Sequence, residues 1–137
     1  MKGVIIVTFL VIFSTILAQQ LPPETLAMFF RIVGAFITKC ACASGVNMNL
    51  LSLFLEQGFT PFNPCVACFI KCLAKEIGLI GGDGITLLEE PVINFALQLP
   101  GGTKEIGLTC INQTVGILDP CRKIFEAYMC GVKLLSS

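Results

Sequence analysis

The sequence contains no histidine, and this absence excludes several kinds of functional site at once. Without imidazole there is no Ser-His-Asp or Cys-His nucleophile arrangement, no histidine ligand for zinc, and no use of the commonest general base. The side chain that ordinarily changes charge between pH 5 and 8 is also missing. A pH-dependent release of any ligand would therefore have to depend on carboxylates or on the C-terminus.

Charged residues are scarce as well. Only 13% of the 137 residues are charged, and nine Lys and Arg balance nine Asp and Glu. No basic excess exists to neutralise phosphates, so we predict no nucleic-acid partner.

The sequence also lacks a catalytic pair of carboxylates. Glu89-Glu90 is no acid/base pair, because adjacent side chains diverge on a helix. With no phosphate loop and no metal-ligand cluster, we predict a protein that is not an enzyme and has no cofactor and no metal.

Hydrophobic residues are abundant instead, at 55% of the chain, which excludes disorder and favours one domain. Lys2, an apolar run from Gly3 to Leu17, and then Ala18-Gln19 form the pattern of a secretory signal peptide. The run is shorter than the ~20 residues that span a bilayer. We predict a signal peptide over residues 1–18, a mature domain over residues 19–137, and an extracellular location. An uncleaved membrane anchor is the alternative.

Proline, glycine and capping residues divide the mature chain into helix-sized segments without an alternating strand pattern. Asn63-Pro64 and Asp119-Pro120 each combine a cap with a proline at the first helical position. Pro91 predicts a late start or a kink in the fourth segment. The predicted fold is all-α, with about six short helices over residues 22–44, 47–58, 63–78, 86–98, 103–115 and 119–132.

Eight cysteines in a secreted chain predict a framework of disulfides. Cys65, Cys68 and Cys72 share one face of the third predicted helix, which therefore joins several other segments. Cys121 and Cys130 are nine residues apart, about 13.5 Å along a helix, and cannot bridge each other. These restrictions reduce the number of possible pairings without selecting one.

The order and spacing of six cysteines resemble the insect odorant-binding protein family, of the pheromone- and general-odorant-binding type. Successive cysteines are separated by 27, 3, 37, 10 and 8 residues, in the order Cys40, Cys68, Cys72, Cys110, Cys121 and Cys130. Ser44-Gly45 after the first of them resembles the family's Thr/Ser-Gly at that place. The resemblance covers essentially the whole mature chain.

This resemblance implies a helical shell around one apolar cavity, stapled by disulfides. The family's pairing of first with third, second with fifth and fourth with sixth implies Cys40–Cys72, Cys68–Cys121 and Cys110–Cys130. Cys42 and Cys65 lie outside the six-cysteine pattern. We expect a fourth bridge between them; free thiols, or competition with Cys40 for Cys72, are the alternatives.

The candidate ligand-binding residues are apolar, apart from Tyr128, the only tyrosine and the candidate polar group for orienting a ligand. They are Phe36, Leu53, Phe54, Phe69, Leu73, Leu88, Val92, Phe95, Ile111, Val115, Phe125, Tyr128 and Leu134. Ordinary core packing is the alternative for each of them. At the C-terminus, Leu134 and its apolar neighbours are expected to fold inward as a cavity wall, or else to fray. Asn112-Gln113-Thr114 is a candidate N-glycosylation site.

The predicted function is a secreted carrier that binds a small, neutral, apolar ligand and delivers it to a receptor. An olfactory receptor or a second copy of the chain are the expected protein partners, without stable membrane insertion. One alternative is a membrane-active or self-associating helical protein, because Arg31 is the only charge between Glu24 and Lys39. A carrier in a glandular, venom or seminal secretion is another.

Overall fold

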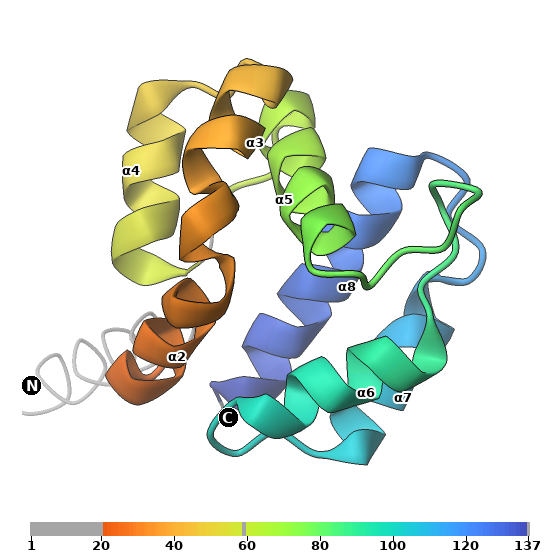
Figure 1. The fold of residues 1–137 in the computed structure, drawn as a ribbon. Helices are drawn as coiled ribbons and strands as arrows, with labels where there is room; N and C mark the ends of the chain where they lie inside the picture. Colours follow the sequence, from red (N-terminus) through yellow and green to blue (C-terminus); the bar gives the residue numbers. More distant parts are fainter. Residues whose placement is uncertain (1–20, 59, 137) are drawn as a thin grey trace, which may run out of the picture.

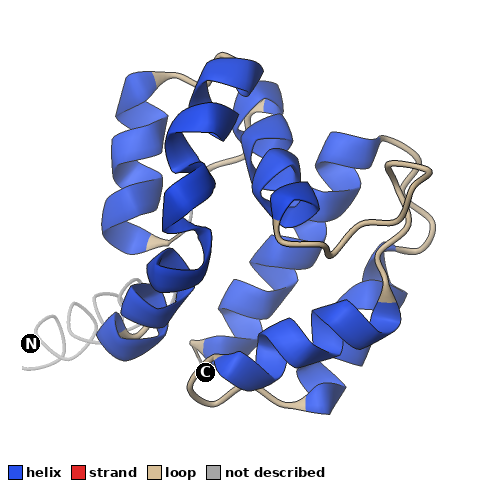
Figure 2. Cartoon of the chain, in the orientation of Figure 1, coloured by secondary structure: helices blue, strands red, loops and turns tan. Residues whose placement is uncertain are grey.

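The computed structural model describes residues 21–58 and 60–136, which form helices joined by loops (Figure 1). The predicted signal peptide lies outside these residues. The helices are α2 (Pro23–Val33), α3 (Ile37–Ser44), α4 (Met48–Gln57), α5 (Pro64–Glu76), α6 (Glu89–Gln98), α7 (Lys104–Thr114) and α8 (Pro120–Leu135). The 3₁₀ turn η1 (Gly34–Phe36) joins α2 to α3 in one helical run. Figure 2 shows helices and loops throughout the described residues, so the all-α prediction is confirmed.

Both predicted combinations of cap and proline begin a helix. The Asn63 side chain accepts hydrogen bonds from the backbone N–H groups of Cys65 (2.9 Å) and Val66 (3.3 Å), which α5 leaves without a helical partner. The Asp119 carboxylate accepts one from the Arg122 N–H at 2.8 Å, at the start of α8. Local sequence therefore determines where these two central helices begin.

The fourth segment starts late, as Pro91 predicted. Helix α6 begins at Glu89, so Pro91 stands in its first turn, where a missing N–H costs no helical hydrogen bond. The residues before it form a turn that an isolated Ile80–Leu87 bridge closes. Within this turn, hydrogen bonds from Thr86 lower the pKa of the exposed Asp83 carboxyl to about 2.

The C-terminal residues are helical. Helix α8 has 16 residues, continues through Leu135, and passes close to the middle of the molecule in Figure 1. Val132 is buried in its last turn, and Leu135 follows one turn later on the same side. The expected inward packing therefore occurs at Val132 and Leu135, through an extension of the sixth helix, but not at Leu134.

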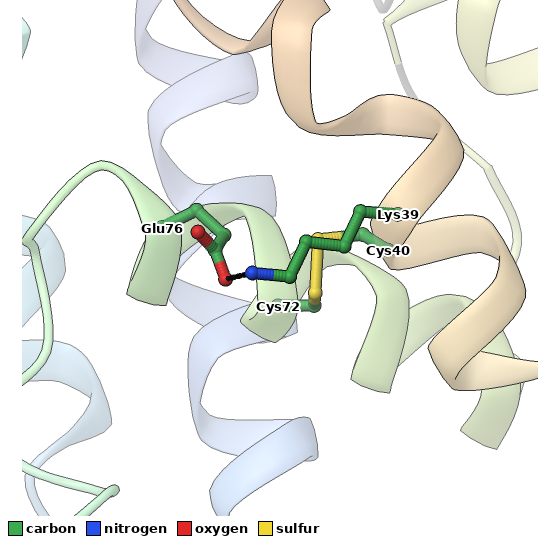
Figure 3. A network of polar contacts seen from close by, with 4 residues as sticks. All are labelled: Lys39, Cys40, Cys72 and Glu76. Atoms are coloured by element: carbon green, nitrogen blue, oxygen red, sulfur yellow. Dashed lines mark hydrogen bonds and ion pairs between the residues drawn. A yellow bond between two sulfur atoms is a disulfide. The ribbon is translucent and has the colours of Figure 1, made fainter.

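Three disulfides hold the helices together, and they are the three that the family resemblance implied. They are Cys40–Cys72 between α3 and α5, Cys68–Cys121 between α5 and α8, and Cys110–Cys130 between α7 and α8. Beside the first, Lys39 Nζ lies 2.7 Å from Glu76 Oε1, a second link between α3 and α5 (Figure 3). Helix α5 thus takes part in two of the three bridges.

The expected fourth bridge is wrong, since Cys42 and Cys65 are free and exposed. Cys42 follows Cys40 by two residues, which is about 200° around the axis of α3. Because Cys40 faces α5 to reach Cys72, Cys42 lies on the side of α3 that is turned away from α5.

Helix α4 is attached to the other helices through an aromatic cluster. The Phe54 ring is 1% exposed, and its centroid lies 5.9 Å from Phe29, 5.8 Å from Phe30, 5.5 Å from Phe69 and 5.8 Å from Tyr128. Edge-to-face contacts of this kind stabilise by about 0.5–1.5 kcal/mol beyond the burial of apolar area. The cluster joins α2, α4, α5 and α8 on one side of the cavity described next.

Candidate ligand-binding cavity

An apolar cavity of about 120 Å³ lies between α2, α5, α6, α7 and α8. The segment from Leu21 to Val33, with helices α5 and α6, contributes the following lining residues: Leu21, Thr25, Phe29, Val33, Ile70, Leu73, Ala74, Ile77, Val92, Phe95, Ala96 and Leu99. Helices α7 and α8 and the loop before α6 contribute the rest: Leu79, Leu87, Ile106, Gly107, Cys110, Ile111, Ile124, Ala127, Tyr128, Gly131, Val132 and Leu135.

The lining residues recur at helical spacing, which explains how one continuous wall forms. Helix α8 contributes positions i, i+3, i+4, i+7, i+8 and i+11, counted from Ile124 to Leu135. The segment entering and forming α2 contributes every fourth residue from Leu21 to Val33. Each helix therefore turns one stripe toward the same space.

The polar side chains that line the cavity are two hydroxyls, and no charged side chain is among the lining residues. Thr25 is 1% exposed, and its Oγ1 donates a long hydrogen bond of 3.5 Å to the Pro100 carbonyl. The Tyr128 hydroxyl donates to the Gly58 carbonyl. Tyr128 as a whole residue is half-buried, but its hydroxyl is interior, and burial raises the pKa of this phenol. The wall is therefore neutral and almost entirely apolar.

Comparison with known proteins identifies the family. The model of the PBP/GOBP family matches residues 24–133, which include every helix from α3 to α7 and most of α2 and α8. The chain belongs to the PBP/GOBP family. This is the insect odorant- and pheromone-binding family, a family of secreted proteins that bind small apolar ligands. No curated protein and no solved structure matches the chain significantly.

In this PBP/GOBP chain, five of the predicted binding residues line the cavity. They are Leu73, Val92, Phe95, Ile111 and Tyr128. They come from α5, α6, α7 and α8, so these side chains from distant parts of the chain do meet around one space. Their role in binding stays a prediction.

Three predicted aromatic residues lie in the solid core instead of the cavity wall. Phe54 and Phe69 are each 1% exposed and contact one another, and Phe125 is 4% exposed and packs against the Phe62 ring at 5.3 Å. Helical periodicity identifies inward-facing residues. It does not tell whether such a residue meets another side chain or an open space.

The remaining five predicted residues do not line the cavity. Leu88 and Val115 flank the ends of α6 and α7 and are exposed, at 37% and 65%. Phe36, Leu53 and Leu134 are half-buried elsewhere. Because α8 stays helical to Leu135, Leu134 is turned about 100° away from the side that Leu135 presents to the cavity.

Sequence reasoning missed the small and polar residues of the wall. Ala96, Gly107, Ala127 and Gly131 leave room because they have little or no side chain, and a search for large apolar residues passes over them. Thr25 was missed because a single threonine in an apolar helix matches no binding motif. Its position four residues from Phe29, on the buried stripe of α2, was the available signal.

The glycosylation candidate Asn112 is exposed on α7. The Thr114 hydroxyl of the same motif is buried and donates to the carbonyls of Cys110 at 3.0 Å and Ile111 at 3.1 Å. Any modification at Asn112 would therefore have to precede the folding of this helix. The occupancy of the site stays a prediction.

Within residues 21–58 and 60–136, no group of three or more His, Cys, Asp or Glu is placed to hold a metal ion. One helical run, Pro23–Ser44, has 22 residues and is long and apolar enough to cross a membrane by length and composition alone. In the fold, Phe29, Val33 and Cys40 of this run are buried against other helices.

Proposed function

We propose that this PBP/GOBP protein is a secreted carrier that binds one small, neutral, mostly apolar molecule inside the cavity and delivers it to a receptor. The observation that supports binding is the cavity itself, an interior space walled by five helical segments with no charged side chain. A natural apolar core is close-packed, with few voids larger than a water molecule. An apolar space lined by two dozen residues is therefore a feature that a ligand would use.

The cavity volume restricts the size of the ligand. An engineered apolar cavity of about 150 Å³ in another protein takes up benzene. At about 120 Å³, this cavity holds a molecule of comparable size in its present shape. A longer ligand would have to displace side chains of the wall. Leu21 precedes α2, Leu135 ends α8, and Leu79 and Leu87 lie in the loop before α6, so these side chains can move with little disruption of a helix.

Secretion and delivery form the finer part of the proposal. The apolar run before Ala18 supports secretion through a cleaved signal peptide, and three disulfides suit an oxidising extracellular compartment. A neutral wall favours neutral cargo, because an anion would enter without a cation to pair with. The receptor, olfactory or glandular, would take the ligand from the carrier.

A series of straight-chain alcohols tests the carrier function. The secreted protein is titrated calorimetrically with 1-butanol through 1-dodecanol. Each buried CH₂ contributes about 0.8 kcal/mol, so affinity should rise roughly fourfold per carbon until the cavity is full, and then level off or fall. Native mass spectrometry should show one alcohol per chain. The absence of uptake along the whole series, or uptake without a size limit, would contradict binding in this cavity.

Membrane activity remains a second candidate, and the apolar run Pro23–Ser44 is the observation that favours it. The run is tied to α5 through Cys40–Cys72, and its buried stripe forms part of the core, so insertion would expose that core. Leakage of a dye from anionic vesicles separates the two functions. A carrier should release none at concentrations that saturate alcohol binding, and release without alcohol uptake would favour the second function.

A further inference from the structure

The two free thiols lie at one end of the molecule. Cys42 is in the last turn and a half of α3, and Cys65 is the second residue of α5. Figure 1 shows the end of α3, the start of α4 and the start of α5 together at the top of the molecule. Both thiols are exposed, and neither has a bridging partner within the chain. A secreted chain would therefore present two unpaired thiols at this end of the molecule.

The chain segments that form this end contain few charged residues. Between Cys40 and Ile70 the sequence contains one charged residue, Glu56, and it stands in the last turn of α4, away from the start of that helix. The remaining charged residues of the described chain lie outside this stretch. We call the surface formed by the last turns of α3 and the first turns of α4 and α5 the uncharged end.

Two large apolar side chains are exposed at the uncharged end. Met48 begins α4 and is 68% exposed, and Phe62, two residues before α5, is 45% exposed. Met and Phe are enriched at protein interfaces, whereas charged residues are depleted at interface cores. One charge from the first turn of α8 lies beside this surface, because the Arg122 guanidinium is 4.9 Å from the centroid of the Phe62 ring.

We propose that the uncharged end is the interface of a homodimer, closed by two disulfides that join Cys42 of each copy to Cys65 of the other. A two-fold axis places each surface against itself, so that charged residues close to the axis would meet like charges. The uncharged end avoids this penalty. Reciprocal pairing of Cys42 with Cys65 across one two-fold axis bridges both cysteines of each copy. A Cys42–Cys42 or Cys65–Cys65 bridge would leave the other cysteine of each copy without a partner.

The bridges form by thiol–disulfide exchange with a low-molecular-weight disulfide such as oxidised glutathione. The Cys65 thiolate attacks it to give a mixed disulfide and releases one thiol. The partner subunit's Cys42 thiolate then attacks the protein sulfur of the mixed disulfide and releases the second thiol. Each protein bridge thus consumes two protein thiols and reduces one small disulfide to two thiols. The proposal depends on secretion and does not depend on ligand binding.

The test is the mass of the full chain secreted from insect cells, before and after mild reduction. We expect a covalent dimer that separates on reduction, with Cys42–Cys65 interchain peptides in a non-reduced digest. Cys42→Ser and Cys65→Ser should each yield monomer. A wild-type monomer would overturn the proposal, whether its thiols are free, bridged to each other or blocked by glutathione. A covalent dimer that survives both single substitutions would overturn it as well.

A second pair of variants tests the surface itself without altering a cysteine. Met48→Glu introduces a charge that would face its own copy, and should reduce the covalent dimer fraction at least fivefold. Leu97→Glu is the matched control, because Leu97 is 56% exposed on α6, at the opposite end of the molecule. The same dimer fraction in both variants would contradict an interface at the uncharged end. An unchanged far-ultraviolet circular dichroism spectrum and thermal unfolding midpoint in every variant show that the fold is intact.

Discussion

At the scale of single residues, Tyr128 both packs in the aromatic core cluster and lines the cavity. Its ring contacts Phe29 at 5.5 Å and Phe54 at 5.8 Å, and its hydroxyl donates to the Gly58 carbonyl at the end of α4. It is also the only tyrosine in a chain without tryptophan. Near-ultraviolet absorbance and fluorescence above the phenylalanine bands therefore report on one side chain of the cavity wall.

Burial of the Tyr128 hydroxyl predicts a pH dependence of stability. Burial raises the folded-state pKa above the unfolded value of 10.0, because the interior disfavours the phenolate. The stability contributed by the neutral phenol is complete below pH 10 and is lost as the pH rises from there toward the folded-state pKa. The free energy of unfolding should fall by about 1.4 kcal/mol per pH unit above pH 10 from this residue.

The measurement is the absorbance of tyrosinate at alkaline pH, recorded with far-ultraviolet circular dichroism. Ionisation and loss of helix should coincide. Tyr128→Phe should lack this steep alkaline destabilisation while costing about 1–2 kcal/mol at neutral pH, since the Gly58 carbonyl loses its donor. Titration of the phenol near pH 10 in a chain that remains helical would contradict the buried position.

The direction of the same hydrogen bond predicts a preference among ligands. Because the Tyr128 hydrogen is used by the Gly58 carbonyl, the hydroxyl offers a ligand only lone pairs. The Thr25 hydroxyl donates to Pro100, although that bond is long. An alcohol can donate to these oxygens, whereas a ketone of the same skeleton would bury an unpaired carbonyl. Cyclohexanol should bind about tenfold more tightly than cyclohexanone, and Tyr128→Phe should reduce this ratio. Equal affinities for wild type would contradict the assignment.

At the scale of helices, the sequence predicted where helices start and end more reliably than it predicted what each inward-facing side chain contacts. Asn63 and Asp119 begin α5 and α8 because a side-chain oxygen next to a proline satisfies local N–H groups, which requires no tertiary information. The binding residues were harder, since Phe54 and Leu73 both face inward and only the three-dimensional packing decides which one borders the cavity. Cys42 and Cys65 show the same limit, because exposure and separation between helices decide their state.

The ends of α3 and α4 provide a matched pair of glycines for a prediction. Gly45 has φ 65° and open space where a Cβ would stand, while Gly58 has φ 78° and would bring a Cβ within 2.7 Å of Leu21 Cδ1 and 2.9 Å of Leu26 Cδ1. Both glycines adopt the left-handed conformation that disfavours alanine. Gly45→Ala should cost about 1 kcal/mol of unfolding free energy. Gly58→Ala should cost about 2–3 kcal/mol, because it also displaces Leu21 and Leu26.

Chemical denaturation of both variants measures this difference, and ligand titration adds a second observable. Leu21 lines the cavity, so Gly58→Ala should also change alcohol affinity, whereas Gly45→Ala should not. Equal losses of stability together with unchanged binding would show that the contact between Gly58 and Leu21 has no part in shaping the cavity wall.

At the scale of the whole molecule, the disulfides supply stability that a domain with an interior cavity needs. Their cysteines are separated by 32, 53 and 20 positions in the sequence. On the chain-entropy account these closures contribute about 3–4 kcal/mol each, with the longest loop contributing most. The Cys68→Ala/Cys121→Ala double variant should therefore lose about 4 kcal/mol, and Cys110→Ala/Cys130→Ala about 3 kcal/mol. Urea unfolding of both oxidised double variants checks this order, and a reversed order would show that packing around the bridges outweighs loop length.

We propose that ligand occupies the cavity between α2, α5, α6, α7 and α8. The most direct measurement is a titration with 1-hexanol, followed through the fluorescence of Tyr128, for wild type and two leucine variants. Ala127 lines the cavity, so Ala127→Leu should fill part of it and weaken binding at least tenfold. Ala27 is exposed on α2, so Ala27→Leu should bind as wild type does. We expect a saturable change in Tyr128 fluorescence, with an affinity for 1-hexanol that Ala127→Leu lowers and Ala27→Leu leaves unchanged. An unchanged affinity in Ala127→Leu, or no response from Tyr128 when 1-hexanol binds, would contradict it.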